Sequence, residues 1–265
     1  MLIIVAGNDT MGLGKAVRES ELMKLHSFLN EKRIIDKWPD DYPLMVDSGA
    51  HSWNKETTTK IGIKRNSKLR PAEEFIKEYY DYIKANNEKK VVWVEFDVYG
   101  HLPEKLIDRY ASEIEEMNLT GEFMRVYHPL IDNGSLRALK EWVEQGHRYI
   151  GIGNDSSHLL DEIFSITRDK VKVHGFAMTK LDLMERYPFF SVDSTSPCST
   201  MIFGTYSVPI MSFKDKQDVF NEKSIECFDS TYEKLEKAVI ETRKTQDYIT
   251  EVWRKKGIQW ENLKL

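Results

Sequence analysis

Cysteine is scarce in this sequence, and its scarcity argues against two kinds of structure. The 265-residue chain has two cysteines, Cys198 and Cys227, which form neither a CxxC pair nor a disulfide framework. This usage is typical of a reducing cytoplasm and argues against a structural zinc site. The histidines show no HxH or HExxH spacing that would make a metal site. We therefore expect neither a metal nor a cofactor.

Long apolar runs and an excess of positive charge are also lacking. No stretch approaches the length of a membrane-spanning helix. The start of the chain has no basic flank, so we interpret it as a first strand rather than a signal peptide. The net charge of -5 does not suggest a general nucleic-acid binder. Lysine and arginine do cluster at 60–70 and at 243–256, where solvated surface is the simplest interpretation.

Apolar runs rich in β-branched residues alternate with longer amphipathic stretches, a pattern that predicts a parallel α/β sheet covered by helices. A count of about eight strand-helix units favours a (β/α)8 TIM-type barrel over an open doubly wound sheet. No GxGxxG follows a strand, so a Rossmann fold is disfavoured. The length suits one domain over 1–265, with a helical C-terminal extension from about 215 to 265.

The predicted elements follow from these periodicities. Strands are expected at Leu2–Ala6, Leu44–Asp47, Val91–Asp97, Phe123–Tyr127, Tyr149–Gly153, Val171–Met178 and Phe189–Asp193, with a weaker one near Thr205–Ile210. Helices are expected at Pro71–Asn86, Pro103–Met117, Ser135–Gln145 and Ser156–Arg168, and in the charged stretch Lys216–Lys255.

Aspartate occurs at the carboxyl ends of three predicted strands, where the active sites of parallel barrels lie. Asp47 ends the second predicted strand, Asp97 the third and Asp193 the seventh. One such aspartate is readily explained as a helix cap. Three at one mouth indicate chemistry instead, because clustered carboxylates resist simultaneous ionisation. Paired carboxylates suit substitution at an anomeric carbon, where one is the nucleophile and the other moves a proton.

Other strand ends offer glycine and histidine. Gly151 and Gly153 would let a flat ligand approach the backbone, although packing against a neighbouring helix explains them equally well. His128 is a candidate to hydrogen-bond a ligand edge, and a structural role is its alternative.

Several short motifs resemble those of the tRNA-guanine transglycosylases. The segment from Asp47 to Ser52, DSGAHS, resembles the family's DSGGFQ. In family order there follow EFD at 95–97, similar to AFDE, GIGN at 151–154, similar to GLAVGE, HGFA at 174–177, similar to MGVG, and SVD at 191–193, similar to FDC. The resemblance runs from about Leu44 to Thr195, so it covers the predicted barrel and not the tail.

This resemblance implies a role for each candidate residue. Asp193 corresponds to the nucleophile that attacks the anomeric carbon and holds a covalent glycosyl intermediate. Asp47 corresponds to the proton carrier, and Asp97 to the aspartate that reads the guanine edge. The base site would be completed by Ser48, Gly49, His128, Tyr149, Gly151, Gly153 and Asn154.

Two departures from the family pattern bear on the substrate. The family's zinc-binding cysteine cluster is absent, and Ser194-Thr195-Ser196-Pro197 stands where Pro-Thr-Arg follows the family's nucleophile. In this reduced form the chain is similar to relatives encoded by viruses and genomic islands, which place 7-deazaguanines in DNA. The resemblance implies exchange of guanine in DNA for a free 7-deazaguanine such as 7-cyano-7-deazaguanine, in the cytoplasm of a bacterial or virus-infected cell. The basic stretch at 60–70 is the candidate for DNA backbone contact.

Three alternatives stay open at this point. The polymer is tRNA in the first, a zinc-free transglycosylase of queuosine or archaeosine type. The second is a non-catalytic nucleic-acid-binding subunit, against which the presence of Asp47 and Asp193 argues. The third is an ordinary glycoside hydrolase or nucleosidase on the same barrel, for which strand-end carboxylates would suffice. The sequence does not predict an oligomeric state.

Overall fold

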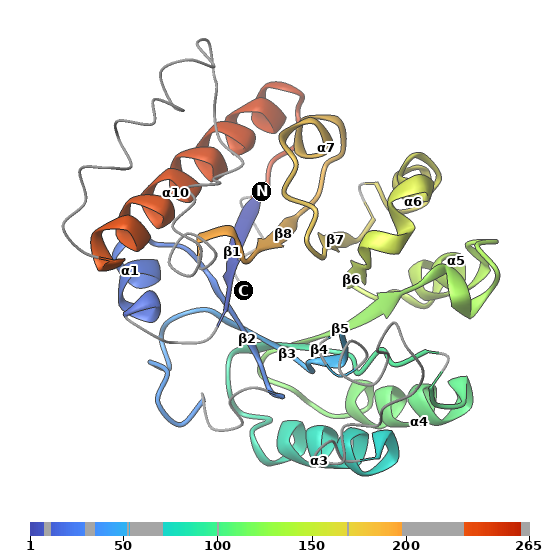
Figure 1. Cartoon of the computed structure of the whole chain (residues 1–265). Coiled ribbons are helices and arrows are strands. Elements are labelled where there is room, and N and C mark those ends of the chain that lie inside the picture. Colours follow the sequence, from blue (N-terminus) through green and yellow to red (C-terminus); the bar gives the residue numbers. More distant parts are fainter. Residues whose placement is uncertain are drawn as a thin grey trace, which may run out of the picture. The chain divides into compact units, whose positions relative to one another are not determined.

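The computed structural model describes residues 1–7, 12–29, 35–51, 53, 71–99, 101–168, 170–197 and 231–260. Eight parallel strands follow one another in chain order around a closed barrel, and helices alternate with them (Figure 1). The predicted (β/α)8 barrel is therefore confirmed. The strands are β1 (Leu2–Ala6), β2 (Lys24–Ser27), β3 (Leu44–Asp47), β4 (Val91–Val94), β5 (Glu122–Tyr127), β6 (Tyr149–Ile152), β7 (Lys172–Gly175) and β8 (Ser191–Ser194).

Strand β2 is the one that the sequence pattern did not predict. Its residues Lys24 and His26 interrupt any apolar run, yet both side chains are fully buried, with Leu25 between them also buried. Buried polar side chains therefore concealed a strand that the barrel needs. The weak strand predicted at 205–210 lies outside the described residues.

The extra strand corrects the position of all three aspartates. Asp47 ends the third strand rather than the second, and Asp193 lies within the eighth rather than at the end of the seventh. Asp97 is not a strand residue, because β4 stops at Val94 and the chain continues through a non-repetitive segment.

The helices predicted at 71–86, 103–117 and 135–145 begin and end close to the expected bounds. The short helices α1 (Leu13–Glu19) and α7 (Leu181–Arg186) were not predicted, and residues 216–230 of the charged stretch lie outside the described residues. Pro71 and Pro103 directly precede α3 and α4, as their fixed backbone angle favours. The predicted helix at 156–168 is a 3-10 turn, η2 (Asn154–Leu159), followed by α6 (Leu160–Thr167). None of the helices in the described part of the chain is long and apolar enough to span a membrane. Besides η2 and α6, the helices are α1 (Leu13–Glu19), α3 (Ala72–Ala85), α4 (Glu104–Glu115), η1 (Pro129–Ile131), α5 (Arg137–Gln145), α7 (Leu181–Arg186) and α10 (Thr231–Lys255).

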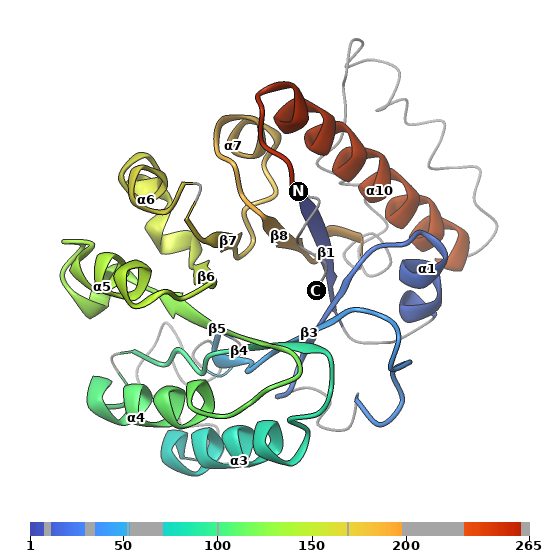
Figure 2. The ribbon, with the colours of Figure 1, turned by 180° about the vertical axis from the view of Figure 1, so that it is seen from behind.

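The chain divides into two compact units, the first of which combines Met1–Leu25 with the described residues from Thr167 onward. In this unit α10 lies beside α1, β1 and α7 in both views (Figures 1 and 2). Leu235 and Val239 of α10 pack in one apolar cluster with Val5 of β1. The helix is therefore part of this unit's core.

The second unit, His26–Ile166, carries an aromatic core. Helices α3 and α4 lie side by side in both views (Figures 1 and 2). Phe75 and Tyr79 of α3 pack on Phe28, with ring centroids 5.7 Å and 5.1 Å from its ring. Burying such large side chains is a major source of stability for the strands beneath.

Candidate functional site

Asp47 ends β3 and folds back on the turn that follows it. Its Oδ2 accepts a hydrogen bond from the Gly49 amide at 3.0 Å. Gly49 has a φ of 88° in the left-handed region, and a Cβ there would meet the side chain of Leu29, so glycine is required. Ser48 is fully buried, and its Oγ accepts a hydrogen bond from the Ala50 amide at 3.3 Å. Ser48 and Gly49 thus shape the turn that carries Asp47, and their contact with a ligand stays a prediction.

A tyrosine of α3 connects the ends of β3 and β4. The Tyr79 hydroxyl lies 3.0 Å from the Val46 carbonyl and 2.7 Å from the Val94 carbonyl. Burial raises the pKa of Tyr79 well above its ordinary value, and the negative charge of Asp47 acts in the same direction. Asp97 adds a smaller effect of the same sign, so both site carboxylates act on this one buried hydroxyl.

Asp97 belongs to a chain of three ionisable side chains that the structure brings together. The Nε2 atom of His128 lies 2.6 Å from Asp97 Oδ2, and its Nδ1 atom lies 3.1 Å from Asp155 Oδ2. Burial alone would lower the pKa of His128, but the hydrogen bonds to Asp155 and Asp97 outweigh it and raise the pKa to about 10. The ring is therefore an imidazolium at neutral pH, with a carboxylate on each nitrogen.

The two predicted glycines occupy different surroundings. Gly151 lies within β6 opposite Val126 of β5. A Cβ on Gly153 would lie 2.5 Å from Asp155 Oδ1 and 2.9 Å from His128 Cε1. The side chains of Asp155 and His128 therefore occupy the space that a side chain at position 153 would need. Gly153 thus makes room for His128 and Asp155.

The other two predicted residues lie at opposite ends of β6, because Tyr149 begins the strand whereas Asn154 follows its carboxyl end. Tyr149 of β6 is buried, and Asn154 is exposed at the start of η2. Among the residues that the sequence pattern did not single out, Asp155 has the clearest signal. It directly follows the GIGN segment, and an acidic residue there faces the strand end that holds His128.

A buried ion pair beside Asp97 was not predicted either. Glu95 is fully buried and lies 2.8 Å from Arg125 Nε, while its other oxygen accepts a hydrogen bond from the Val126 amide at 2.8 Å. Burial raises the pKa of Glu95 to about 7, although the charge of Arg125 opposes this. Arg125 also contacts Asp108 of α4 and stacks over Trp142 of α5 at 4.7 Å. The ion pair connects the segment after β4 to β5, and Arg125 connects β5 to α4 and α5.

Asp193 is held by partners of its own in the first unit. Its Oδ1 accepts a hydrogen bond from the Ala177 amide at 2.9 Å and lies 3.4 Å from His174 Nε2. The other ring nitrogen of His174 lies 2.7 Å from Ser191 Oγ. Ala177 has a φ of 55°, an uncommon backbone conformation for a residue with a side chain. This residue supplies the amide that donates to the Asp193 carboxylate. The side chain of Asp193 is 12% exposed.

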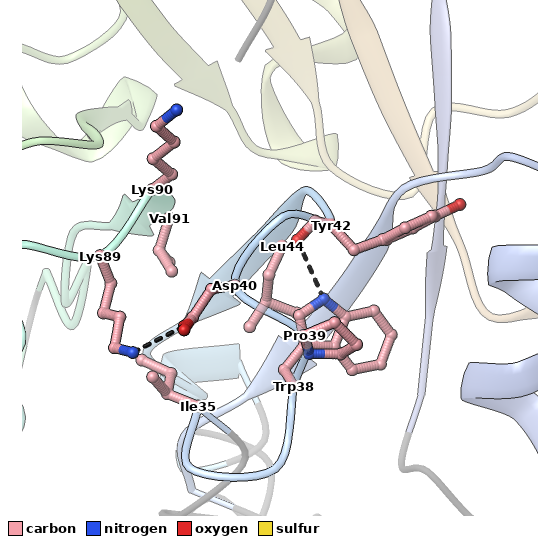
Figure 3. A pocket seen from close by; sticks show the side chains of 9 residues that line it. All are labelled: Ile35, Trp38, Pro39, Asp40, Tyr42, Leu44, Lys89, Lys90 and Val91. Carbon is pink, nitrogen blue, oxygen red and sulfur yellow. Dashed lines mark hydrogen bonds and ion pairs between the residues drawn. The ribbon is translucent and has the colours of Figure 1, made fainter.

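A hollow at the opposite ends of two strands is shown in Figure 3. It is lined partly by Leu44 and Val91, which begin β3 and β4, so it lies at their amino ends. A pair between Lys89 and Asp40 at 2.6 Å lies at its wall. In a parallel barrel this end contributes stability rather than chemistry. Within the described ranges, no group of three or more His, Cys, Asp or Glu side chains is arranged so that it could hold a metal ion.

The basic residues near the C-terminus are largely paired with acids. In α10, Arg243 contacts Asp247 at 2.9 Å, Lys244 contacts Glu241 at 2.5 Å, and Arg254 contacts Glu251 at 2.7 Å. These pairs support the interpretation of this cluster as solvated surface. The basic stretch at 60–70 lies outside the described residues.

No protein-family model, curated protein or solved structure matches the chain. The fold is thus established by the strand order, and the function has to be argued from the site itself.

Proposed function

We propose that this protein is a guanine transglycosylase, which exchanges guanine in DNA for a free 7-deazaguanine such as 7-cyano-7-deazaguanine. The arrangement around Asp193 is the observation that supports this most. The carboxylate accepts a hydrogen bond through Oδ1 from the Ala177 amide, with His174 Nε2 nearby at 3.4 Å, and among the described residues Oδ2 has no hydrogen bond or ion pair. A fixed carboxylate with one uncommitted oxygen is what a nucleophile on a sugar carbon needs.

In the proposed reaction, Asp193 Oδ2 attacks the anomeric carbon of the target nucleotide while the bond from that carbon to the base nitrogen breaks. Asp47 gives the departing guanine its proton and later takes the proton of the incoming 7-deazaguanine. The incoming base attacks the same carbon, and Asp193 leaves as a free carboxylate. The exchange requires Asp193 and Asp47 to reach the same nucleoside, and it requires no cofactor.

Base recognition is assigned to Asp97. Its Oδ2 is bound by His128, and Oδ1 has no hydrogen bond or ion pair among the described residues. A carboxylate oxygen accepts well from adjacent N–H groups such as the ring N–H and amino group of guanine. This edge is shared by guanine and 7-deazaguanines, so one pocket can serve the leaving and the entering base.

The polymer is assigned from the resemblance to short relatives that modify DNA. A base inside a duplex is out of reach, so the target is single-stranded or flipped out of the stack, at a cost of a few kcal/mol. The protein is proposed to act in the cytoplasm of a bacterial or virus-infected cell.

The test is incorporation of radiolabelled guanine into single-stranded DNA, duplex DNA and unmodified tRNA by the purified protein. Label in DNA alone is expected. Label in tRNA alone would replace the proposal with the queuosine or archaeosine type of enzyme. Label in neither polymer, with a folded protein, would contradict the proposal as stated. Asp193→Asn is the inactive variant, and Asp182→Asn, at an exposed carboxylate of α7, is the matched control.

A further inference from the structure

His128 has no ring nitrogen left for a ligand. Both nitrogens face carboxylate oxygens, Asp97 Oδ2 at 2.6 Å and Asp155 Oδ2 at 3.1 Å. The Tyr99 ring lies against the imidazole, with centroids 5.9 Å apart. The side chains of His128 and Asp97 are 19% and 18% exposed, whereas that of Asp155 is 48% exposed. The ring is thus fixed between an outer and an inner carboxylate.

We propose that His128 and Asp155 are positioning residues that hold Asp97 as a hydrogen-bond acceptor, so that the pocket selects a base edge with two adjacent N–H donors. This rests on the proposed function only for the identity of the ligand as a nucleobase. His128 acts through Asp97 rather than by touching the base, which differs from the direct ligand contact expected from the sequence.

The chemistry of imidazole supports this assignment. A neutral imidazole has one N–H donor and one acceptor, so placed between two carboxylates it would turn a lone pair toward one of them. The imidazolium donates from both nitrogens and satisfies both carboxylates. Asp97 Oδ2 then accepts from the ring, and Oδ1 is left to accept from a base.

The consequence for selectivity follows from that restriction. Guanine and 7-deazaguanines offer two neighbouring N–H donors on one edge, which an acceptor-only carboxylate can bind. Hypoxanthine lacks the amino group and offers only one of the two donors. A base that presents an acceptor at this edge would repel the carboxylate. Leaving a polar group of a closed site unpaired is a strong basis of discrimination. His128 and Asp155 therefore set which edge is accepted.

The glycine at position 153 leaves room for the side chains of His128 and Asp155. A side chain on Gly153 would collide with both members, at 2.5 Å from Asp155 Oδ1 and 2.9 Å from His128 Cε1. Burial alone would raise the pKa of Asp155, but the hydrogen bond from His128, the charge of His128 and backbone hydrogen bonds together lower it. Asp155 is therefore ionised at neutral pH, as the positioning role requires.

The first measurement is the protonation state of His128 as a function of pH. It is monitored by long-range proton-nitrogen NMR of the histidine rings in the full chain. His128→Asn identifies the signal among the seven histidines. In the wild type we expect His128 to stay protonated from pH 6 to pH 9. In Asp155→Asn its pKa should fall into this range, and Asp155→Glu should restore it. An ordinary titration of His128 in the wild type would overturn the proposal.

The second measurement is base exchange by the same variants, with guanine and hypoxanthine as competing bases. At pH 8.5, Asp155→Asn should raise the KM for guanine roughly tenfold and leave kcat nearly unchanged. The reason is that the charge-assisted hydrogen bond between His128 and Asp97 becomes disordered, so Asp97 is less well placed to bind the base. At pH 6, where His128 regains its proton, the KM should return toward the wild-type value. His158→Asn, at an exposed histidine of η2, is the control.

The two measurements separate the failure of this proposal from the failure of the proposed function. A wild type that neither exchanges nor binds guanine overturns the proposed function and the base selection with it, whereas the titration reports on the pair without any substrate. An unchanged KM in Asp155→Asn, in an enzyme that does exchange guanine, overturns only the positioning role.

Discussion

His174 Nε2 lies 3.4 Å from Asp193 Oδ1, and its Nδ1 lies 2.7 Å from Ser191 Oγ. The ring is fully buried, so it connects the carboxylate to the beginning of its own strand β8. On the other side the Phe176 ring packs edge-on, with centroids 4.4 Å apart. The Asp193 carboxylate therefore lies between a hydrogen bond from the Ala177 amide and the packed ring of His174.

Replacing the proposed nucleophile should abolish exchange without unfolding the protein. Asp193→Ala removes the only group assigned to form the covalent intermediate, and we expect activity to fall roughly a thousandfold or more. The Ala177 amide loses its acceptor, which should lower the free energy of unfolding by about 1–3 kcal/mol. Exchange rate and urea denaturation measure the two effects. A variant that still exchanges guanine would remove the nucleophile assignment.

His174→Asn tests whether the buried ring positions Asp193. Since misplacing a reacting group by an ångström can lower a rate by about two orders of magnitude, we expect kcat to fall roughly 10- to 100-fold. The KM for the base should change little, because the ring contacts the carboxylate and not the base site. Steady-state kinetics separate the two constants, and denaturation shows whether stability has changed. An effect confined to stability would make His174 purely structural.

Asp97→Ala should weaken base binding more than it slows the chemical step. Loss of the proposed acceptor is expected to raise the KM for guanine roughly 10- to 100-fold and to reduce discrimination against hypoxanthine. Competition between the two labelled bases measures both changes. If Asp97→Ala instead unfolds the protein at ordinary temperature, the aspartate serves the structure and not the base.

Stability should depend on pH through His128. Its pKa in the folded protein is about 10, above the ordinary value of 6.5, so the folded state holds this proton more tightly than the unfolded chain does. The resulting stabilisation is complete below pH 6.5 and is lost as the pH rises toward 10. The groups facing the ring are Asp97, Asp155 and Tyr99.

The measurement is the difference in free energy of unfolding between wild type and His128→Asn at several pH values. This difference should shrink between pH 6.5 and pH 10, because the other titrating groups are common to both proteins. A difference that stays constant over that window would contradict the raised pKa.

Arg125→Met should destabilise the second unit strongly. It leaves Glu95 buried without its cation, and breaking a buried pair in this way costs about 3–5 kcal/mol. The loss should be smaller at pH 5 than at pH 8, since at low pH the isolated Glu95 takes up a proton. Combining Arg125→Met with Glu95→Gln should recover part of the stability. Urea denaturation at both pH values measures this, and an equal loss at each would contradict the assignment.

The strands whose apolar runs are uninterrupted could be predicted from the sequence. Leu2–Ala6 and Leu44–Asp47 form as expected, because a continuous β-branched or aliphatic run buried on both faces leaves a clear trace. β2 left no such trace, since Lys24 and His26 are polar and buried. Tertiary contacts stabilise β2 as a strand, and such contacts cannot be predicted from a local sequence pattern.

The sequence singles out the candidate acids more readily than the residues that contact them. Asp47 ends β3 and Asp193 is the last but one residue of β8, and the ends of parallel strands lie at one edge of the barrel. The Asp97–His128–Asp155 chain joins residues 31 and 27 positions apart, so its hydrogen bonds depend on which strands are neighbours. Sequence identifies such residue types but cannot pair them.

The hydroxyl of Tyr79 has a single proton for two acceptors, the carbonyls of Val46 and Val94. Those carbonyls directly precede Asp47 and the segment that leads to Asp97, so a residue of α3 constrains the spacing of two candidate site acids. Substitutions that vary only the strand ends, made to change the proposed base preference, would leave this constraint in place. The α3 helix and its two strands would have to be exchanged together as one cassette.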